Sequence, residues 1–321
     1  MSDGLAPVEV RGLVKRYGEL TAVAGVDLTV NTGDVYGYLG PNGAGKTTSL
    51  RMMLGLIRPT EGSVRLFGRD PMESVRALEG VAGFVEAPTF YPYLSARKNL
   101  EMLAAYDGGG ASGRVDSALE TVELTDRAKD RVGGYSHGMR QRLGIAAALL
   151  RQPRLLLLDE PATGLDPAGM RDMRLLIRRL ADQGITVLLS SHLLTEVEDV
   201  CNRVAIVRSG RIVYEGEIAE LKRGAGTSYR LETTDDELAL AVCRAQPGVG
   251  DVRSQNARIT FTSDESTAAE LSQALIEAGA LIRALAPQTV TLEDLFFRFT
   301  EGDEPEGPAP PSDPAPAQAA R

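Results

Sequence analysis

The sequence predicts an α/β fold followed by a smaller α+β unit, and three observations support this. Short apolar, β-rich runs alternate with helical stretches over the first two thirds of the chain, which is typical of a sheet covered by helices. The compact runs Leu155–Leu158 and Thr186–Leu189 have the composition of strands buried on both faces. A second pattern of strands and helices begins near Arg223–Gly226.

The first unit is expected to span residues 1–224. We expect a strand at Val35–Leu39, a helix at Lys46–Leu56 and a further strand at Val64–Phe67. The strand signal then disappears over residues 95–150, which are expected to form a helical subdomain containing the glycine cluster 108–110.

The second unit is expected to span residues 225–300 and to follow a β-α-β-β-α-β order. The strands are expected at Ser228–Thr233, Val252–Arg253, Arg258–Thr262 and Leu281–Leu285, and the helices at Glu237–Arg244, Ala268–Ala278 and, closing the unit, Leu292–Phe299. This order indicates a small ferredoxin-like module. Residues 301–321 are rich in proline and alanine without periodicity, so we expect a disordered tail.

Composition narrows the class of protein. A chain of 321 residues has room for about two domains. The net charge of -9 argues against a dominant nucleic-acid-binding surface, which normally carries a basic excess. No apolar run approaches the ~20 residues needed to cross a bilayer, and no secretory signal is visible at the start. Cys201 and Cys243 lack metal-like spacing and are expected to be reduced thiols.

A glycine-rich loop follows the strand Val35–Leu39 and opens the helix that begins at Lys46. Glycines let backbone N–H groups point at phosphate oxygens, and the helix N-terminus favours an anion. Lys46 is expected to reach the β- and γ-phosphates, and the Thr47 hydroxyl to ligate Mg²⁺. The pattern predicts an ATP-type phosphate site formed by Gly40, Pro41, Asn42, Gly43, Ala44, Gly45, Lys46, Thr47 and Thr48.

Two adjacent carboxylates follow the apolar run Leu155–Leu158. A strand that ends in this way presents both carboxylates at the carboxyl edge of the sheet, where folds of this kind bind ligands. Asp159 is expected to hold Mg²⁺, directly or through water. Glu160 is suited to accept a proton from an attacking water.

With these two motifs the sequence resembles the ATP-binding-cassette (ABC) family of P-loop ATPases. The segment upstream of the carboxylates resembles that family's signature loop. Ser136 and Gly138 match its Ser and second Gly, while Tyr135, His137 and Met139 depart from the commonest form. The resemblance implies that the signature loop of one subunit completes the ATP site of the other, so that a homodimer holds two ATP molecules head to tail.

Three further matches follow from the same resemblance. Ala162–Asp166 resembles the family's dimer-contact loop, and His192 matches the switch histidine that contacts the γ-phosphate. Tyr17 matches the aromatic residue that stacks on adenine, although a tyrosine packed into the core is the alternative.

One position departs from the family in a way that bears on the metal. Glu86 stands where the family normally has a glutamine near Mg²⁺ and the membrane partner. A carboxylate can ligate Mg²⁺, so we expect Glu86 to belong to the metal site. The neighbouring aromatic segment Thr89–Leu94 matches the groove that receives a short helix of the membrane subunit in relatives, with a place in the core as the alternative.

The resemblance covers residues 8–222 and implies an ATPase. The second unit resembles the accessory domain of daunorubicin-type bacterial exporters, with Val290–Phe296 as the best local match. The leading interpretation is the ATP-binding and ATP-hydrolysing subunit of an ABC-2-type drug or antibiotic exporter similar to the bacitracin type. It would energise export of a drug, antibiotic or lipid-like substrate through a separate polytopic permease, at the cytoplasmic face of the membrane. A soluble ABC ATPase of the repair or translation type is the alternative, although the chain shows neither a long coiled coil nor a second cassette.

Overall fold

The described part of the chain forms three β-sheets. The computed structural model describes residues 5–106, 110–224, 227–255, 258–288, 291–292 and 295–296. The largest sheet has six strands in the spatial order β5-β6-β7-β3-β8-β9. These strands are β5 (Val81–Phe84), β6 (Leu155–Asp159), β7 (Thr186–Ser191), β3 (Val35–Leu39), β8 (Arg203–Arg208) and β9 (Arg211–Glu217). All neighbouring pairs are parallel except β8 and β9, which are antiparallel.

The centre of this sheet is buried on both faces. Every residue of β3, β6 and β7 is buried, as the compact apolar runs predict. Side chains alternate between the two faces, so Leu156 and Leu158 of β6 enter one hydrophobic core while Leu155 and Leu157 enter another. The carboxyl ends of these strands therefore lie at one fixed edge, where polar residues can be presented.

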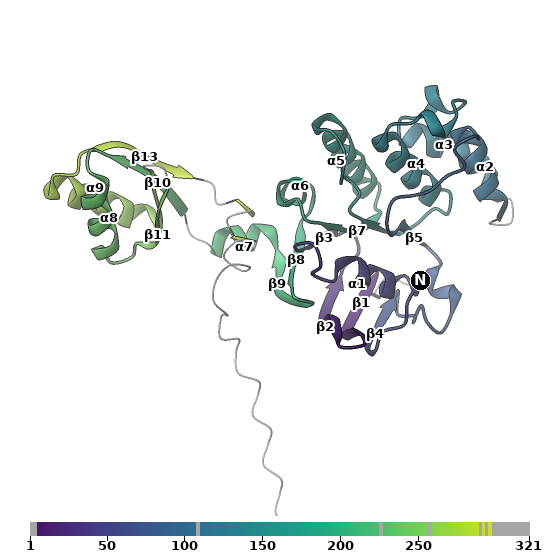
Figure 1. The fold of residues 1–321 in the computed structure, drawn as a ribbon, viewed down its shortest axis with the longest axis horizontal. Helices are drawn as coiled ribbons and strands as arrows, with labels where there is room; N and C mark the ends of the chain where they lie inside the picture. The colour runs from purple at the N-terminus through teal and green to yellow at the C-terminus, as the bar shows by residue number, and fades with distance from the viewer. Residues whose placement is uncertain are drawn as a thin grey trace, which may run out of the picture.

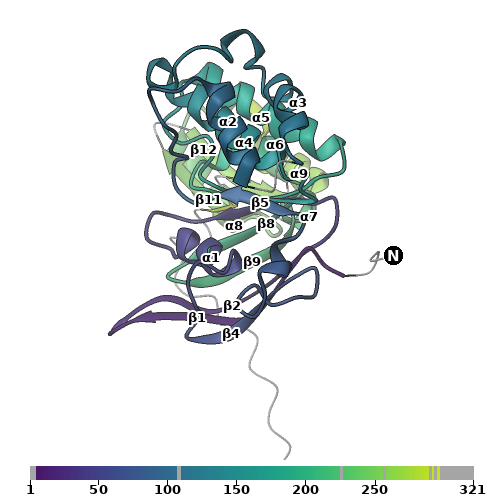
Figure 2. The same cartoon turned by 90° about the vertical axis from the view of Figure 1, so that its right-hand side faces the viewer.

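A three-stranded antiparallel sheet covers one face. It consists of β2 (Leu20–Val30), β1 (Val8–Tyr17) and β4 (Glu61–Leu66), in that order, and it shares a core with α1 (Lys46–Met53). Figure 2 shows this sheet below the central one, with α1 between them. The sequence predicted β4 at a slightly different position but did not distinguish β1 and β2.

Helices cover the opposite face. They are α2 (Ala96–Tyr106), α3 (Val115–Thr121), α4 (His137–Leu149), α5 (Pro167–Asp182) and α6 (Leu194–Val200), and they stand above the central sheet in Figure 2. The first three of these, with short 3-10 turns between them, occupy the stretch 95–150 that the sequence predicted to be helical. Most of the expected glycine cluster 108–110 lies outside the described residues.

The third sheet belongs to the C-terminal part of the chain. After α7 (Ile218–Gly224), the elements are β10 (Thr227–Thr233), α8 (Asp236–Ala245), β11 (Gly250–Gln255), β12 (Arg258–Ser263), α9 (Glu265–Ala278) and β13 (Ile282–Gln288). The strands lie in the order β11-β12-β10-β13, all antiparallel. Figure 1 shows α8 and α9 packed on this sheet, where Leu231, Phe261 and Leu271 are part of a separate core.

The segment after β13 returns to the first unit. Leu292 and Leu295 are buried in the core beneath α2–α6, and the backbone N–H of Leu292 donates to Glu198 of α6 over 2.9 Å. The rest of the expected closing helix, and the tail 301–321, lie outside the described residues. Within the described ranges, no helix combines the length and the hydropathy required to cross a bilayer.

Candidate active site

The glycine-rich loop connects the end of β3 to the start of α1. A Cβ atom on Gly40 would lie 2.5 Å from the Val207 carbonyl oxygen, so only glycine allows the loop to pass this close to β8. Gly45 has φ of 97° at the N-cap of α1, and no side chain caps the helix there. The N–H groups at the start of α1 are thus available to an anion.

Lys46 is buried at the first position of α1. Its ammonium donates to the carbonyl oxygens of Gly40 at 2.8 Å and Pro41 at 3.2 Å, and lies 3.1 Å from Glu160 Oε1. Only 5% of the side chain is exposed, so these contacts offset the cost of burying the charge. The loop holds the ammonium at its centre, as expected for a phosphate-binding lysine.

Thr47 and Asp159 meet across the gap between α1 and β6. The Thr47 hydroxyl donates to Asp159 Oδ2 over 2.8 Å, and the Ser190 hydroxyl of β7 donates to Asp159 Oδ1 over 2.5 Å. Both carboxylate oxygens are therefore oriented by hydroxyl groups. Two hard oxygen ligands, one from the first turn of α1 and one from the sheet edge, are thereby brought into contact.

Glu160 follows directly with φ of 49°, in the left-handed region that non-glycine residues adopt sparingly. Its Oε2 accepts a hydrogen bond from the Thr163 hydroxyl at 2.7 Å and lies 2.5 Å from His192 Nδ1. Burial acts to raise the pKa of the Glu160 carboxyl. The Thr163 hydrogen bond and the Lys46 charge outweigh burial, so the pKa is lowered and the group is ionised at neutral pH.

These groups surround a cavity of about 380 Å³ at the carboxyl edge of the central sheet. Its lining is drawn from the loop, from the ends of β6 and β7 and from the N-terminal sheet. The lining residues are Ala22, Asn42, Gly43, Gly45, Lys46, Thr47, Thr48, Glu160, Thr163 and His192. We call this cavity the phosphate-loop pocket.

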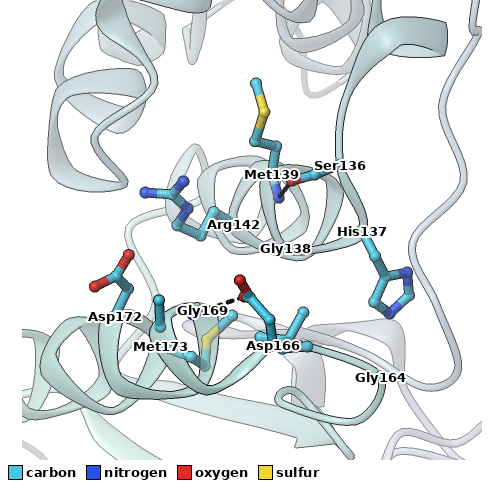
Figure 3. A pocket seen from close by; sticks show the side chains of 12 residues that line it. Ser136, His137, Gly138, Met139, Arg142, Gly164, Asp166, Gly169, Asp172 and Met173 are labelled. Atoms are coloured by element: carbon cyan, nitrogen blue, oxygen red, sulfur yellow. Dashed lines mark hydrogen bonds between the residues drawn. The ribbon is translucent and has the colours of Figure 1, made fainter.

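Ser136 and Gly138 line a different cavity, of about 390 Å³, which we call the signature pocket (Figure 3). It lies between the N-termini of α4 and α5. Ser136 caps α4 by accepting from the Met139 N–H at 3.2 Å, and Asp166 caps α5 by accepting from the Gly169 N–H at 2.9 Å. The structure does not bring the signature residues into the phosphate-loop pocket of the same chain.

Comparison with known proteins identifies the family. The profile of the family described as "ABC transporter" matches residues 23–163. The bacitracin transport ATP-binding protein BcrA of Enterococcus faecalis is 36% identical over 297 residues, covering 92% of this chain and 96% of the relative. This chain is an ABC transporter ATP-binding protein.

Two other relatives agree with that assignment. The daunorubicin/doxorubicin resistance ATP-binding protein DrrA of Streptomyces peucetius is 37% identical over 310 residues, covering 91% of this chain and 92% of the relative. A solved structure described as the ATP binding subunit of an ABC transporter aligns with a TM-score of 0.60 and 27% identity, over 68% of this chain and 92% of its own. The chain is an ATP-binding and ATP-hydrolysing enzyme.

Besides Ser136 and Gly138, the predicted site residues Tyr17 and Glu86 of this ABC ATPase do not line the phosphate-loop pocket. Tyr17 ends β1 with 48% of its surface exposed and with the Lys15 ammonium 5.1 Å from its ring. Tyr17 is thus not a core tyrosine, and the Lys15 ammonium lies over its ring. Glu86 has φ of 71° and forms an ion pair with Arg51 of α1 rather than joining Thr47 and Asp159.

Two hydroxyl residues of the site, Ser190 and Thr163, were not predicted from the sequence as partners of the carboxylates. Ser190 binds Asp159 and also accepts from the Glu160 N–H at 3.0 Å, and Thr163 binds Glu160. The signal in the sequence was a small hydroxyl residue near the end of β7, Ser190, and another three residues after Glu160, Thr163. The particular pairings depend on the neighbouring positions of β6 and β7, which local sequence does not specify.

Proposed function

We propose that this ABC ATPase energises export of a drug, antibiotic or lipid-like substrate through a separate polytopic membrane subunit, at the cytoplasmic face of the membrane. The observation that carries the proposal is the extent of similarity. Relatives named for bacitracin transport and for daunorubicin/doxorubicin resistance match over 92% and 91% of the chain, which takes in the C-terminal sheet as well as the cassette.

We further propose that residues 1–224 act as the ATPase cassette and residues 225–300 as an accessory module. The support is the separate core of β10–β13 with α8 and α9. The return of Leu292 and Leu295 to the cassette core would fasten the module at both of its ends.

The separation of the two pockets supports a homodimer. Lys46 and Glu160 line one cavity, while Ser136 and Gly138 line the other. The N-termini of α4 and α5 make the signature pocket suited to a negatively charged group. Two chains placed head to tail would close each ATP between the phosphate loop of one and the signature loop of the other.

Mg²⁺ fits the oxygen ligands that the phosphate-loop pocket offers. Thr47 and Asp159 would hold it, and phosphate oxygens and water would complete its shell. When bound, Mg²⁺ neutralises charge on the β- and γ-phosphates. Glu86 is the further candidate ligand, and it would have to leave Arg51 to take that role.

Glu160 would act as the base toward the water that attacks the γ-phosphate. Lys46 pairs with Glu160 in the structure, and the phosphate oxygens of ATP would compete for the same ammonium. Loss of that pairing removes one of the charges that lower the pKa of Glu160. ATP binding would therefore make Glu160 a stronger base in the ATP-bound protein. His192 would direct its Nε2 to the γ-phosphate.

The aromatic segment Thr89–Leu94 of this chain offers a surface that the membrane subunit would contact. Tyr91 and Tyr93 are exposed and pack edge to face, 5.8 Å between ring centroids. Asn99 of α2 fixes this segment by accepting from the Tyr91 N–H at 2.9 Å. Beside it lies a cavity of about 290 Å³ lined by Phe90, Tyr91 and Leu103 among others, which suits a short amphipathic helix.

The test is a mild-detergent pull-down of the tagged full chain from its native membranes, with mass spectrometry of the proteins that co-purify. A polytopic membrane protein at near-equal amount is the expected result. Tyr91→Ser should release it, whereas Leu175→Ser should retain it, because Leu175 lies on α5 with the same exposed fraction of 49%. Recovery of soluble or ribosomal partners alone would overturn the transport function and leave the ATPase activity standing.

A further inference from the structure

His137 connects the signature loop to the loop that follows Glu160. Its Nε2 lies 3.1 Å from the carbonyl oxygen of Thr163, and its ring packs against Gly164, where a Cβ atom would lie 3.5 Å from Cδ2. Figure 3 shows the ring turned away from Ser136 and toward Gly164. His137 is one of the positions at which this signature loop departs from the commonest form, and a glycine at this position would have no side chain to make the contact.

The contact fixes the hydrogen on the ring. A carbonyl oxygen accepts only, so Nε2 must carry the hydrogen and donate it to Thr163. The Gln141 side-chain nitrogen lies 3.5 Å from the same Nε2, and the Gln141 oxygen is buried without a hydrogen-bond partner in the described part of the chain. Rotation of the Gln141 side-chain amide by 180° would place its oxygen where it can accept from the His137 Nε2–H. Thr163 and Gln141 can thus compete for one donor, which gives the ring two alternative partners.

Thr163 continues the connection to the base. Its hydroxyl donates to Glu160 Oε2 over 2.7 Å, on the oxygen that also faces His192 Nδ1. Residues 160–163 are further closed by a backbone hydrogen bond from the Thr163 N–H to the Glu160 carbonyl at 3.1 Å. A shift of the Thr163 backbone must therefore move the hydroxyl that orients the Glu160 carboxylate.

We propose that His137 is a positioning residue that acts through Thr163 on Glu160 and so couples the two ATP sites of a dimer. The cross-site part rests on the proposed head-to-tail dimer. In that dimer Ser136 and Gly138 face the partner's ATP, while Glu160 serves the ATP bound to its own chain. Closure of the signature loop on one nucleotide is passed by His137 to the base at the other.

The test is steady-state ATP hydrolysis by the purified full chain over a range of ATP concentrations. His137→Gly removes the contact, and His137→Gln keeps a side-chain N–H that can donate to Thr163. Loss of one hydrogen bond that acts in the hydrolytic step should lower kcat about fivefold in His137→Gly, with the KM for ATP changed less than about twofold. The Hill coefficient should fall toward unity, and His137→Gln should recover most of kcat.

A double-mutant cycle with Thr163→Val tests the route. Thr163→Val removes the hydroxyl that reaches Glu160, so adding His137→Gly should cost little more than either change alone. Met139→Gln, on the same turn but without a contact to Thr163, is the control, and its effect should multiply with that of Thr163→Val. Thermal unfolding of each variant shows whether it is folded.

Three results would overturn the inference. If the fold-changes in kcat caused by His137→Gly and Thr163→Val multiply in the double mutant, the two residues act separately. A rise in the KM for ATP at constant kcat would show that His137 binds the partner's nucleotide directly. If the Glu160→Gln chain fails to dimerise with ATP, the coupling between the two ATP sites falls together with the proposed dimer. If it dimerises normally while the effects of His137→Gly and Thr163→Val on kcat multiply, only the route from His137 through Thr163 to Glu160 is refuted.

Discussion

The two pockets of the cassette are nearly equal in volume, about 380 and 390 Å³, but they are built differently. In the phosphate-loop pocket, Lys46, Asp159 and Glu160 each contact a partner from another element of the fold. In the signature pocket, Ser136 and Asp166 each accept from the first turn of their own helix. The first pocket is a network that connects several elements of the fold, whereas the second is formed by two helix N-termini, each capped by its own side chain.

This difference predicts where hydrolysis is controlled. Changes in the phosphate-loop pocket should act on the chemistry within each chain. Changes at Ser136 in the signature pocket should act on closure around a nucleotide held by a second chain, and should leave ATP binding to a single chain intact.

The largest effect is expected for Glu160→Gln. Loss of the general base should lower kcat by about 10²–10⁴-fold, because a side-chain amide does not accept the proton of the attacking water. ATP affinity should be retained, since Gly40, Pro41 and the N-terminus of α1 still hold Lys46 and the phosphates. Phosphate release gives kcat, and equilibrium dialysis gives the affinity.

Glu120→Gln is the matched control, because Glu120 is an exposed carboxylate of α3 outside both pockets. Its kcat should equal that of the unmodified chain. Turnover by Glu160→Gln at the same level as this control would refute the role of Glu160 as base.

An intermediate effect is expected in the signature pocket, where Ser136→Ala and Ser136→Asp separate helix capping from anion contact. Alanine cannot cap α4 and should lower the free energy of unfolding by about 1 kcal/mol, while aspartate preserves the cap. Aspartate brings a negative charge toward the γ-phosphate, so kcat should fall by about a hundredfold in Ser136→Asp but about tenfold in Ser136→Ala.

The more stable variant should thus be the less active one. Thermal unfolding and phosphate release measure the two properties separately. If activity instead followed helix stability, with Ser136→Ala the less active, the signature pocket would not be an anion site.

The parts of the fold that local sequence determines were predictable. The strand β3 was predicted with its bounds, and β6 and β7 within two residues, because strands buried on both faces are short continuous apolar runs. The loop before Lys46 was predictable because a Cβ atom at Gly40 or Gly45 would collide with the backbone of a neighbouring strand. By contrast, β1 and β2 were not distinguished, since their burial is irregular and their pairing contains bulges.

The site was predictable by residue type but not by pairing. Asp159 and Glu160 were assigned from their place after a strand, yet their partners Ser190 and Thr163 come from contacts set by tertiary structure. The same holds for Glu86, which was expected at the metal but contacts Arg51. A charged side chain on an exposed loop has several possible partners of similar energy, so sequence alone does not choose among them.

The smallest effect is expected at Glu86, which pairs with Arg51 of α1 outside the phosphate-loop pocket. With 67% of its side chain exposed, its ion pair with Arg51 should contribute at most about 1 kcal/mol to stability. Glu86→Ala and Arg51→Gln should therefore lower the unfolding temperature equally and slightly. If Glu86 also contacts Mg²⁺ when ATP is bound, Glu86→Ala alone should raise the Mg²⁺ concentration for half-maximal hydrolysis, by about fivefold for a partly exposed ligand.

Arg51→Gln is the control that separates the two roles, because it breaks the same ion pair and leaves the carboxylate free to reach the metal. Mg²⁺ titrations of phosphate release at saturating ATP measure the difference. Equal Mg²⁺ dependence in the two variants would remove Glu86 from the metal site and leave it as the partner of Arg51. A shift confined to Glu86→Ala would instead extend the connected network of the phosphate-loop pocket to the loop that precedes the aromatic segment Thr89–Leu94.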